Sequence, residues 1–250
     1  MRARSLTASV FVVLSLAAFP ARADEEHVTK TVKLEPGGTL RLNNFSGRVT
    51  ITGTDGTDVV VDALRHASRD HLDAIKLDIH TEGSAVVIEA NKKDSSWHSW
   101  FGHDNVVETD LDIKVPRRTN LDIHVFSSAV DVTGVEGTHR VHGFSSRVRL
   151  ADVTGPIEAH SFSGPIEIRQ KTWQDNQRID VDTFSGGIEL HVPSSANGTV
   201  NFNSFSGHLT SEMPLILGDS SRRSLTAKLG NGTGGTLRLK TFSGNVRIDR

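Results

Sequence analysis

Three histidines occupy the same place in consecutive copies of a short motif. His124, His142 and His160 each stand two residues before a phenylalanine and 18 residues apart. Imidazole nitrogens bind zinc and copper, so histidines held side by side could share an ion. We favour the simpler interpretation, a solvated polar ladder on the outside of stacked strands. A periplasmic metal- or ligand-binding protein that uses this histidine column is the alternative, and we predict no cofactor.

A second group of chemically useful side chains lies in the polar stretch from Asn91 to Asn105. It contains Trp97, Trp100 and Phe101. Aromatic side chains in a polar loop can contact a protein, a glycan or a membrane surface. The same loop could instead fold back and plug one end of the molecule. We treat these three residues as candidates for partner binding.

No set of residues in the chain has the composition of a catalytic site. Gly218-Asp219-Ser220 is similar to the nucleophile block of one esterase family, but no histidine follows Ser220. A serine nucleophile needs an adjacent base. We therefore predict no catalytic residue and a protein that is not an enzyme.

The elements that must position these side chains come from a repeat. Phe-Ser-Gly or Phe-Ser-Ser occurs seven times, and its phenylalanines form the set that we call the phenylalanine column: Phe45, Phe126, Phe144, Phe162, Phe184, Phe205 and Phe242. From Phe126 to Phe205 the spacings are 18, 18, 22 and 21 residues. Short, turn-rich units of this period predict an all-β fold, a β-solenoid of stacked two-strand units.

Each unit alternates strictly on both sides of its phenylalanine. Positions three and five before it, and four and six after it, are apolar in 26 of 28 cases. The positions between them, four before and five after, are polar in all 14 cases. Such alternation indicates strands with one buried face. The phase of the alternation shifts across Phe-Ser-Gly, so the triplet must be a corner or bulge.

The direction of the phenylalanine at each corner follows from this phase. Phe shares the phase of the inward residues that come after it, so we expect it to pack inside the corner. If it pointed outward instead, the column would be an exposed aromatic stripe and a contact surface.

The units are expected to stack in chain order. Asp122, Arg140 and Glu158 would then be neighbours with alternating charge, whereas Glu158 would meet Asp180 at the next junction. The stretch from Pro214 to Gly235 is expected as a loop between the last two corners.

The domain organisation is predicted from the same repeat. We expect a signal peptide over residues 1–23, cleaved after Ala23, because a basic start precedes a short apolar run and small residues. Residues 24–250 then form one solenoid-like domain, with irregular turns over 28–118 and regular repeats over 119–250. In this part we expect one or two turns of helix over 68–75, with Ser68 as N-cap. Strands are expected at 29–34, 40–43, 59–64, 76–80, 85–90, 106–115 and 120–125. A separate N-terminal domain is the alternative.

Composition limits the partners. The 28 basic and 30 acidic residues give a net charge of −2, which argues against nucleic acid as a partner. The chain has no cysteine, so an exported domain must be stable without disulfides. We expect a periplasmic, secreted or cell-surface protein with an envelope or surface partner, protein or glycan, and no transmembrane span after cleavage.

Two stretches carry a resemblance to a known family. VPRRTNLDIHVFSSAVDVTGVEG (115–137) and LGNGTGGTLRLKTFSGNVRID (229–249) resemble the bacterial putative adhesin family, an exported β-repeat domain of unknown function. The resemblance implies a β-solenoid-like envelope or surface protein, and it implies no catalytic residues. The chain departs from the usual family pattern in its regular Phe before Ser-Gly.

Overall fold

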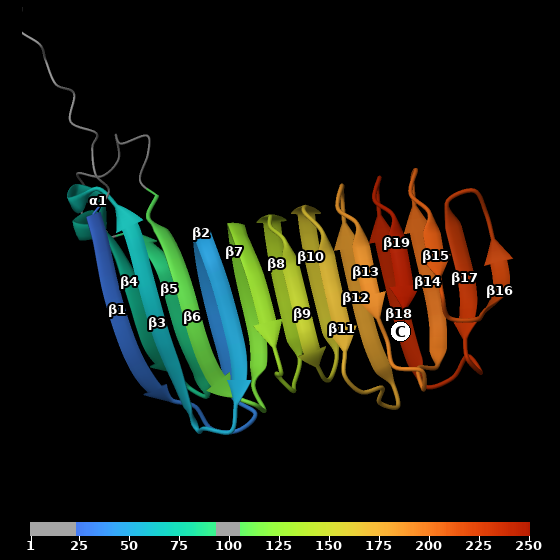
Figure 1. Cartoon of the computed structure of the whole chain (residues 1–250), viewed down its shortest axis with the longest axis horizontal. Helices are drawn as coiled ribbons and strands as arrows, with labels where there is room; N and C mark the ends of the chain where they lie inside the picture. The colour runs from blue at the N-terminus through green and yellow to red at the C-terminus, as the bar shows by residue number, and fades with distance from the viewer. Residues whose placement is uncertain (1–23, 94–105) are drawn as a thin grey trace, which may run out of the picture.

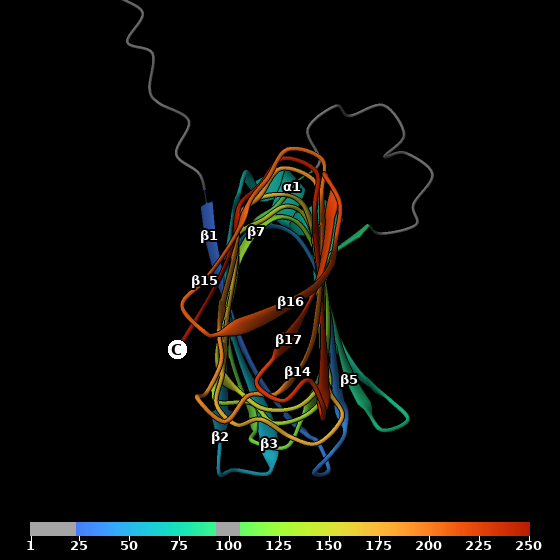
Figure 2. The same ribbon diagram turned by 90° about the vertical axis from the view of Figure 1, so that its right-hand side faces the viewer.

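The structure is a computed structural model, and it describes residues 24–93 and 106–250. These residues form 19 strands and one short helix, α1 (Arg69–Ala74), which begins after Ser68 as expected. The strands stack into one long, flattened β-solenoid (Figure 1). Viewed along its length, the solenoid has two long walls joined by narrow curved edges (Figure 2).

The regular part consists of coils that each place one strand in each wall. β7 (Asn120–Thr133) runs through a corner and lies in both walls. The following coils pair in parallel and in register, as Ile157 opposite His139 shows. Their strands are β8 (His139–Ser145), β9 (Val148–Val153), β10 (Ile157–Ser163), β11 (Ile166–Gln170), β12 (Gln177–Thr183) and β13 (Ile188–His191).

The last coil of the chain does not stack last. β18 (Gly235–Thr241) lies between β12 and β14 (Gly198–Ser204), and β19 (Val246–Asp249) lies between β13 and β15 (Leu209–Ser211). The expectation that units stack in chain order is therefore wrong at this end. Charge explains the order, because Arg238 pairs with Asp180 at 3.1 Å and Lys240 with Asp182 at 2.9 Å.

The stretch expected as a loop from Pro214 to Gly235 contains two strands. β16 (Leu215–Ser220) and β17 (Ser224–Leu229) form an antiparallel hairpin, and β17 pairs with the outer side of β14. The hairpin provides the outermost strands at this end of the solenoid (Figure 2).

The N-terminal strands continue the same sheet. β2 (Thr39–Thr54) turns through a corner at Phe45 and pairs in register with β7 along both walls. The remaining strands pair beyond β2: β1 (Asp24–Lys33), β3 (Asp58–Ala67), β4 (Ile75–Glu82), β5 (Ala85–Lys93) and β6 (Glu108–Pro116). Each strand predicted between residues 29 and 125 overlaps one of these elements or β7, although the predictions 29–34 and 106–115 extend one residue past the end of β1 and two residues before the start of β6.

The core is the space between the two walls. The four predicted inward positions of each unit are buried in every coil except at Leu209 and Ser211, which are half-buried on the short strand β15. Each buried aliphatic side chain contributes roughly 1.5–3 kcal/mol of transfer free energy. These aliphatic ladders hold the coils together and fix which residues point outward at each corner.

Candidate binding surface

The corner of each unit places two consecutive side chains outside. In the unit around Phe162, Ser161 is buried, Phe162 is exposed and Ser163 is half-exposed. The inward-facing positions of the first strand thus extend to the residue directly before Phe. The alternation of inward and outward side chains is interrupted after Phe, where Ser163 also faces outward. The expectation that Phe packs inside the corner is therefore wrong.

The inside of the corner has no room for a phenyl ring. Thr183 Oγ1 accepts a hydrogen bond from the backbone N–H of Gly186 at 2.9 Å, so two small residues fill the apex. A Cβ on Gly186 would lie 1.9 Å from the carbonyl oxygen of Gly164, and one on Gly244 would lie 1.8 Å from that of Gly186. The glycines allow neighbouring corners to approach closely, and the large side chain of the motif must point outward.

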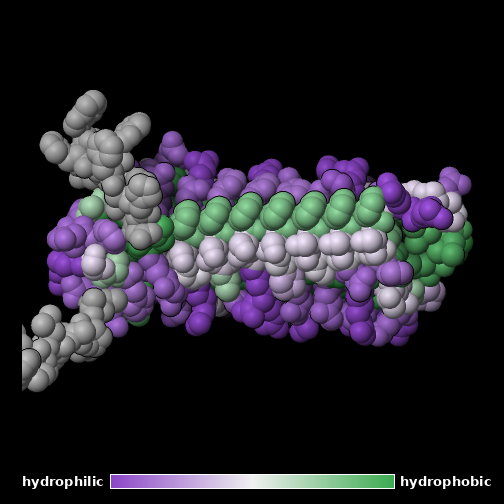
Figure 3. All heavy atoms as spheres, turned by 90° about the horizontal axis from the view of Figure 1, so that it is seen from above, coloured by the Kyte–Doolittle hydropathy of each residue, from purple (hydrophilic) through white to green (hydrophobic). Residues whose placement is uncertain are grey.

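The seven rings form one continuous stack along the narrow edge of the solenoid. Their order in space is Phe45, Phe126, Phe144, Phe162, Phe184, Phe242 and Phe205, with neighbouring centroids 4.7 to 5.0 Å apart and ring planes within 13° of parallel. Figure 3 shows this hydrophobic row running along the molecule. Each phenylalanine is 39–51% exposed.

Because each ring is stacked on its neighbours, the column offers ring edges rather than ring faces to a partner. At 39–51% exposure, the seven side chains leave roughly 600 Å² of contiguous apolar surface accessible. Monomeric soluble proteins rarely expose larger apolar patches, and patches of this size commonly mark interaction sites.

The Arg223 side chain covers the last ring of the column, Phe205. The backbone of Arg223 continues the pairing of β17 with β14, because its carbonyl accepts a hydrogen bond from Ser204 N–H at 2.9 Å. The guanidinium carbon of Arg223 lies 4.1 Å from the ring centroid of Phe205. This cation–π contact covers the outer face of the last ring.

Uncharged and polar rows flank the column. On one side lie the serines that follow each phenylalanine, which are exposed or half-exposed. Figure 3 shows a row of intermediate hydropathy beside the hydrophobic one. On the other side, a hollow of about 320 Å³ separates Phe184, Phe242 and Phe205 from the Asp182–Lys240 ion pair. A second hollow, of about 580 Å³, lies at the N-terminal end of the column. It is lined by the rings of Phe45, Phe126 and Phe144, by His124 and His142, and by β5 residues that include Glu89 and Lys92.

The histidine column has the predicted register. The rings of His124 and His142 stack with centroids 5.0 Å apart, and those of His142 and His160 stack 5.1 Å apart. His124 Nε2 lies 3.1 Å from Asp122, and His160 Nε2 lies 3.3 Å from Glu158. Burial, and then the neighbouring His124 and His160, lower the pKa of His142. Parallel rings do not aim their nitrogens at one point, so a shared ion would require them to rotate.

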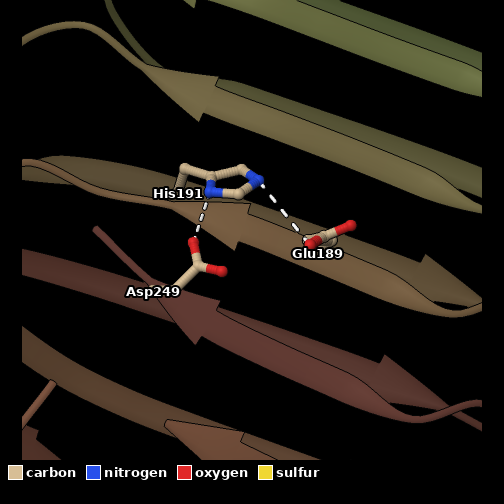
Figure 4. A group of neighbouring side chains, drawn as sticks. All are labelled: Glu189, His191 and Asp249. Atoms are coloured by element: carbon tan, nitrogen blue, oxygen red, sulfur yellow. Dashed lines mark ion pairs between the residues drawn. The ribbon is translucent and has the colours of Figure 1, made fainter. Parts of the chain in front are cut away.

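A separate histidine and two carboxylates meet on the other wall. His191 and Glu189 lie on β13, and Asp249 lies on the neighbouring β19 (Figure 4). His191 Nδ1 contacts one oxygen of Asp249, and Arg247 Nε donates to the other at 3.0 Å. The sequence alone did not indicate this group. Since Arg247 already neutralises Asp249, the cluster is best described as an ion-pair network between two coils.

Trp97, Trp100 and Phe101, and the predicted signal peptide, lie outside the described residues. Among residues 24–93 and 106–250, no helix is long and apolar enough to cross a membrane.

The coil geometry and the repeated corner define the class of protein, a β-solenoid. The model of the Toastrack DUF4097 family matches residues 119–249, more than half of the chain. The chain therefore belongs to the Toastrack DUF4097 family, a family whose domain has no assigned function. This agrees with the resemblance noted from the sequence.

Two solved structures are similar to the chain, and the first of them supports the fold. One is a putative cell adhesion protein from Clostridium sporogenes, 10% identical, with a TM-score of 0.50 over 90% of this chain and 99% of that chain. Another is a putative adhesin from Bacteroides fragilis, 10% identical, with a TM-score of 0.31 over 89% of this chain and 97% of that chain. No curated protein matches the sequence.

Proposed function

We propose that this chain is an exported, non-enzymatic binding module of the bacterial envelope, and that the phenylalanine column is its contact surface. The observation that carries the proposal is the column itself, seven half-exposed rings in one uninterrupted row. Folding alone does not require this exposure, because the coils are already held by the aliphatic core and by backbone pairing.

Sequence and family support the remaining parts of the proposal. The basic and apolar start of the chain favours export to the periplasm or cell surface. A structure with the same fold bears a name that refers to cell adhesion. No residues in the sequence form a nucleophile with its base, which favours binding over catalysis.

The proposal is tested by cofractionation of the expressed chain with native cell envelopes. Phe144→Ser combined with Phe162→Ser should reduce the bound fraction severalfold, because it interrupts the column at its centre. Ile216→Ser combined with Leu217→Ser is the matched control, since these side chains are 62% and 66% exposed on β16, away from the column. Equal binding of the column variant and the unsubstituted chain, with folding confirmed by circular dichroism, would refute the proposal.

The polar stretch that contains Trp97 and Trp100 is a second candidate contact region, proposed from the sequence alone. We expect Trp97→Ala combined with Trp100→Ala to leave the fold intact and to reduce association with the envelope. Unchanged association in a pull-down would remove these residues from the contact surface without affecting the column.

Metal binding by the histidine column is the second candidate function. It is favoured by one observation, three imidazoles stacked on adjacent strands. Titration of the purified chain with zinc and copper tests it. Uptake that His142→Asn abolishes would support it, and no uptake at micromolar metal would remove it.

A further inference from the structure

The column has an odd number of rings and therefore a central ring. A two-fold rotation through that ring places the row of rings on itself, as a contact between two identical chains requires. Phe162 is the fourth ring, with three rings on either side of it. We propose that the partner of the column is a second copy of this chain, packed column against column with the two solenoid axes antiparallel. This inference rests on the proposed function, since it names a partner for the same surface.

The antiparallel arrangement pairs rings by their distance from the centre. Phe162 meets itself across a two-fold axis, and Phe144 of one copy meets Phe184 of the second copy. A two-fold contact of this kind is self-complementary, so every contact made by one copy is repeated by the other. The rings are evenly spaced at 4.7 to 5.0 Å, so the two rows can stay aligned over their whole length.

The rows beside the column are compatible with this contact. Serine faces serine on one side, so no charge is desolvated there. On the other side His142 faces Asp182 of the second copy, and His124 faces Lys240. Asp182 and Lys240 already neutralise each other within one chain at 2.9 Å. At the centre His160 faces His160 of the second copy, and each lies 3.3 Å from Glu158 of its own chain.

The accessible area is adequate for a dimer. The rings supply roughly 600 Å² for each copy, and the adjoining serine row raises the area toward the ~800 Å² for each partner of a standard interface. A glycan fits the column less well, because sugars stack on ring faces and here each face is covered by the next ring. A second row of ring edges needs no free face.

The absence of cysteine from the chain makes a direct test available. Ser163 lies beside the central ring, so Ser163→Cys should meet itself and give disulfide-linked dimers under mild oxidation. Ser127→Cys is the matched control, because it meets Ser243 of the second copy and should remain monomeric. Combining Ser127→Cys with Ser243→Cys should restore cross-linking. All seven phenylalanines remain in each variant.

Sedimentation velocity of the unsubstituted chain over a hundredfold range of concentration completes the test. A concentration-dependent dimer together with selective cross-linking at residue 163 is the expected result. A monomer at every concentration, or cross-linking of Ser127→Cys as efficient as that of Ser163→Cys, would overturn the inference. If the chain is monomeric but column variants still lose envelope association, the inference fails and the proposed function stands. If the dimer forms but column variants associate with the envelope as well as the unsubstituted chain does, the proposed envelope function fails and the dimer stands.

Discussion

At the scale of single residues, one titratable side chain replaces an aliphatic one inside the solenoid. His139 lies between Leu121 and Ile157 of the neighbouring coils and is fully buried. Its Nε2 lies 3.2 Å from the carbonyl oxygen of Thr154, and its Nδ1 has no hydrogen-bond partner. Burial lowers the pKa of His139 from 6.5 to about 4. The histidine is therefore neutral in the folded chain at neutral pH.

This depressed pKa predicts an acid-sensitive contribution to stability. Below pH 6.5 the unfolded chain binds a proton that folded His139 does not, so the free energy of unfolding decreases as the pH falls toward 4. The loss approaches about 3 kcal/mol at the lower end of that window. His139→Leu should remove this loss and stabilise the chain at pH 5, measured by urea unfolding at pH 7 and pH 5. A pH dependence in His139→Leu equal to that of the unsubstituted chain would contradict the assignment.

A second residue-scale prediction concerns the corner glycines. Gly186→Ala places a Cβ 1.9 Å from a neighbouring carbonyl oxygen, so the coils must separate locally. We expect a loss of about 1–3 kcal/mol in the free energy of unfolding. Gly56→Ala, whose Cβ would meet only a side-chain oxygen at 3.5 Å, should cost less than about 0.5 kcal/mol. Equal costs for the two variants would show that corner spacing is not the constraint.

At the scale of the strands, charge selects which coil follows β12. Asp180 faces Glu158 on β10 and Arg238 on β18. Arg238→Glu would place three carboxylates in a row and should lower stability by about 0.5–1 kcal/mol. Adding Asp180→Arg should recover the lost stability, because the charges in the row then alternate in sign. Thermal unfolding at low salt measures both variants, and a double variant no more stable than the single one would argue against the charge explanation.

The strands also show what the sequence could predict. The alternation of Leu121, Ile123, Val130 and Val132 is strict, so the solenoid, its buried faces and the register of the histidines were all predictable. The direction of the corner phenylalanines was not predictable from the alternation. The inward residues directly before them, such as Ser161 and Thr183, are small and polar, so they do not read as buried positions in the sequence. Their small size was the available indication that no ring fits inside.

The order of the last coils was missed for a related reason. Chain order is the default expectation for stacked repeats, and Asn201 and Asn203 on β14 are polar enough to fit beside Asp180 and Asp182. The basic Arg238 and Lys240 fit these carboxylates better, and this could have been found by comparing all pairs of units. The Glu189–His191–Asp249 network depends on the same order, so it was hidden as well.

At the scale of the whole molecule, the inward aliphatic residues stabilise the fold, and the phenylalanine column is the proposed contact surface. Phe162→Ser removes half-buried stacking and should cost about 1–2 kcal/mol of unfolding free energy, yet the solenoid should still fold. The corresponding inward substitution Ile166→Ser should cost considerably more, about 3–5 kcal/mol. Urea unfolding of the two variants measures the difference. If Phe162→Ser were as destabilising as Ile166→Ser, the column would serve folding rather than contact.

The continuity of the column depends on the final coil entering between two earlier ones, and engineered disulfides test this most directly. Residues 185 and 243 lie at the corners of adjacent coils, where the N–H of Ser243 donates to the carbonyl oxygen of Phe184 at 3.1 Å. Adjacent coils are about 4.8 Å apart, within the ~4.4–6.8 Å range of disulfide-linked Cα atoms. Residues 185 and 206 are separated by the intervening corner of the last coil, which contains Ser243. We predict that Ser185→Cys with Ser243→Cys forms an intramolecular disulfide in dilute solution, whereas Ser185→Cys with Ser206→Cys does not. The opposite pattern would show that the coils stack in chain order and would contradict this account of the column.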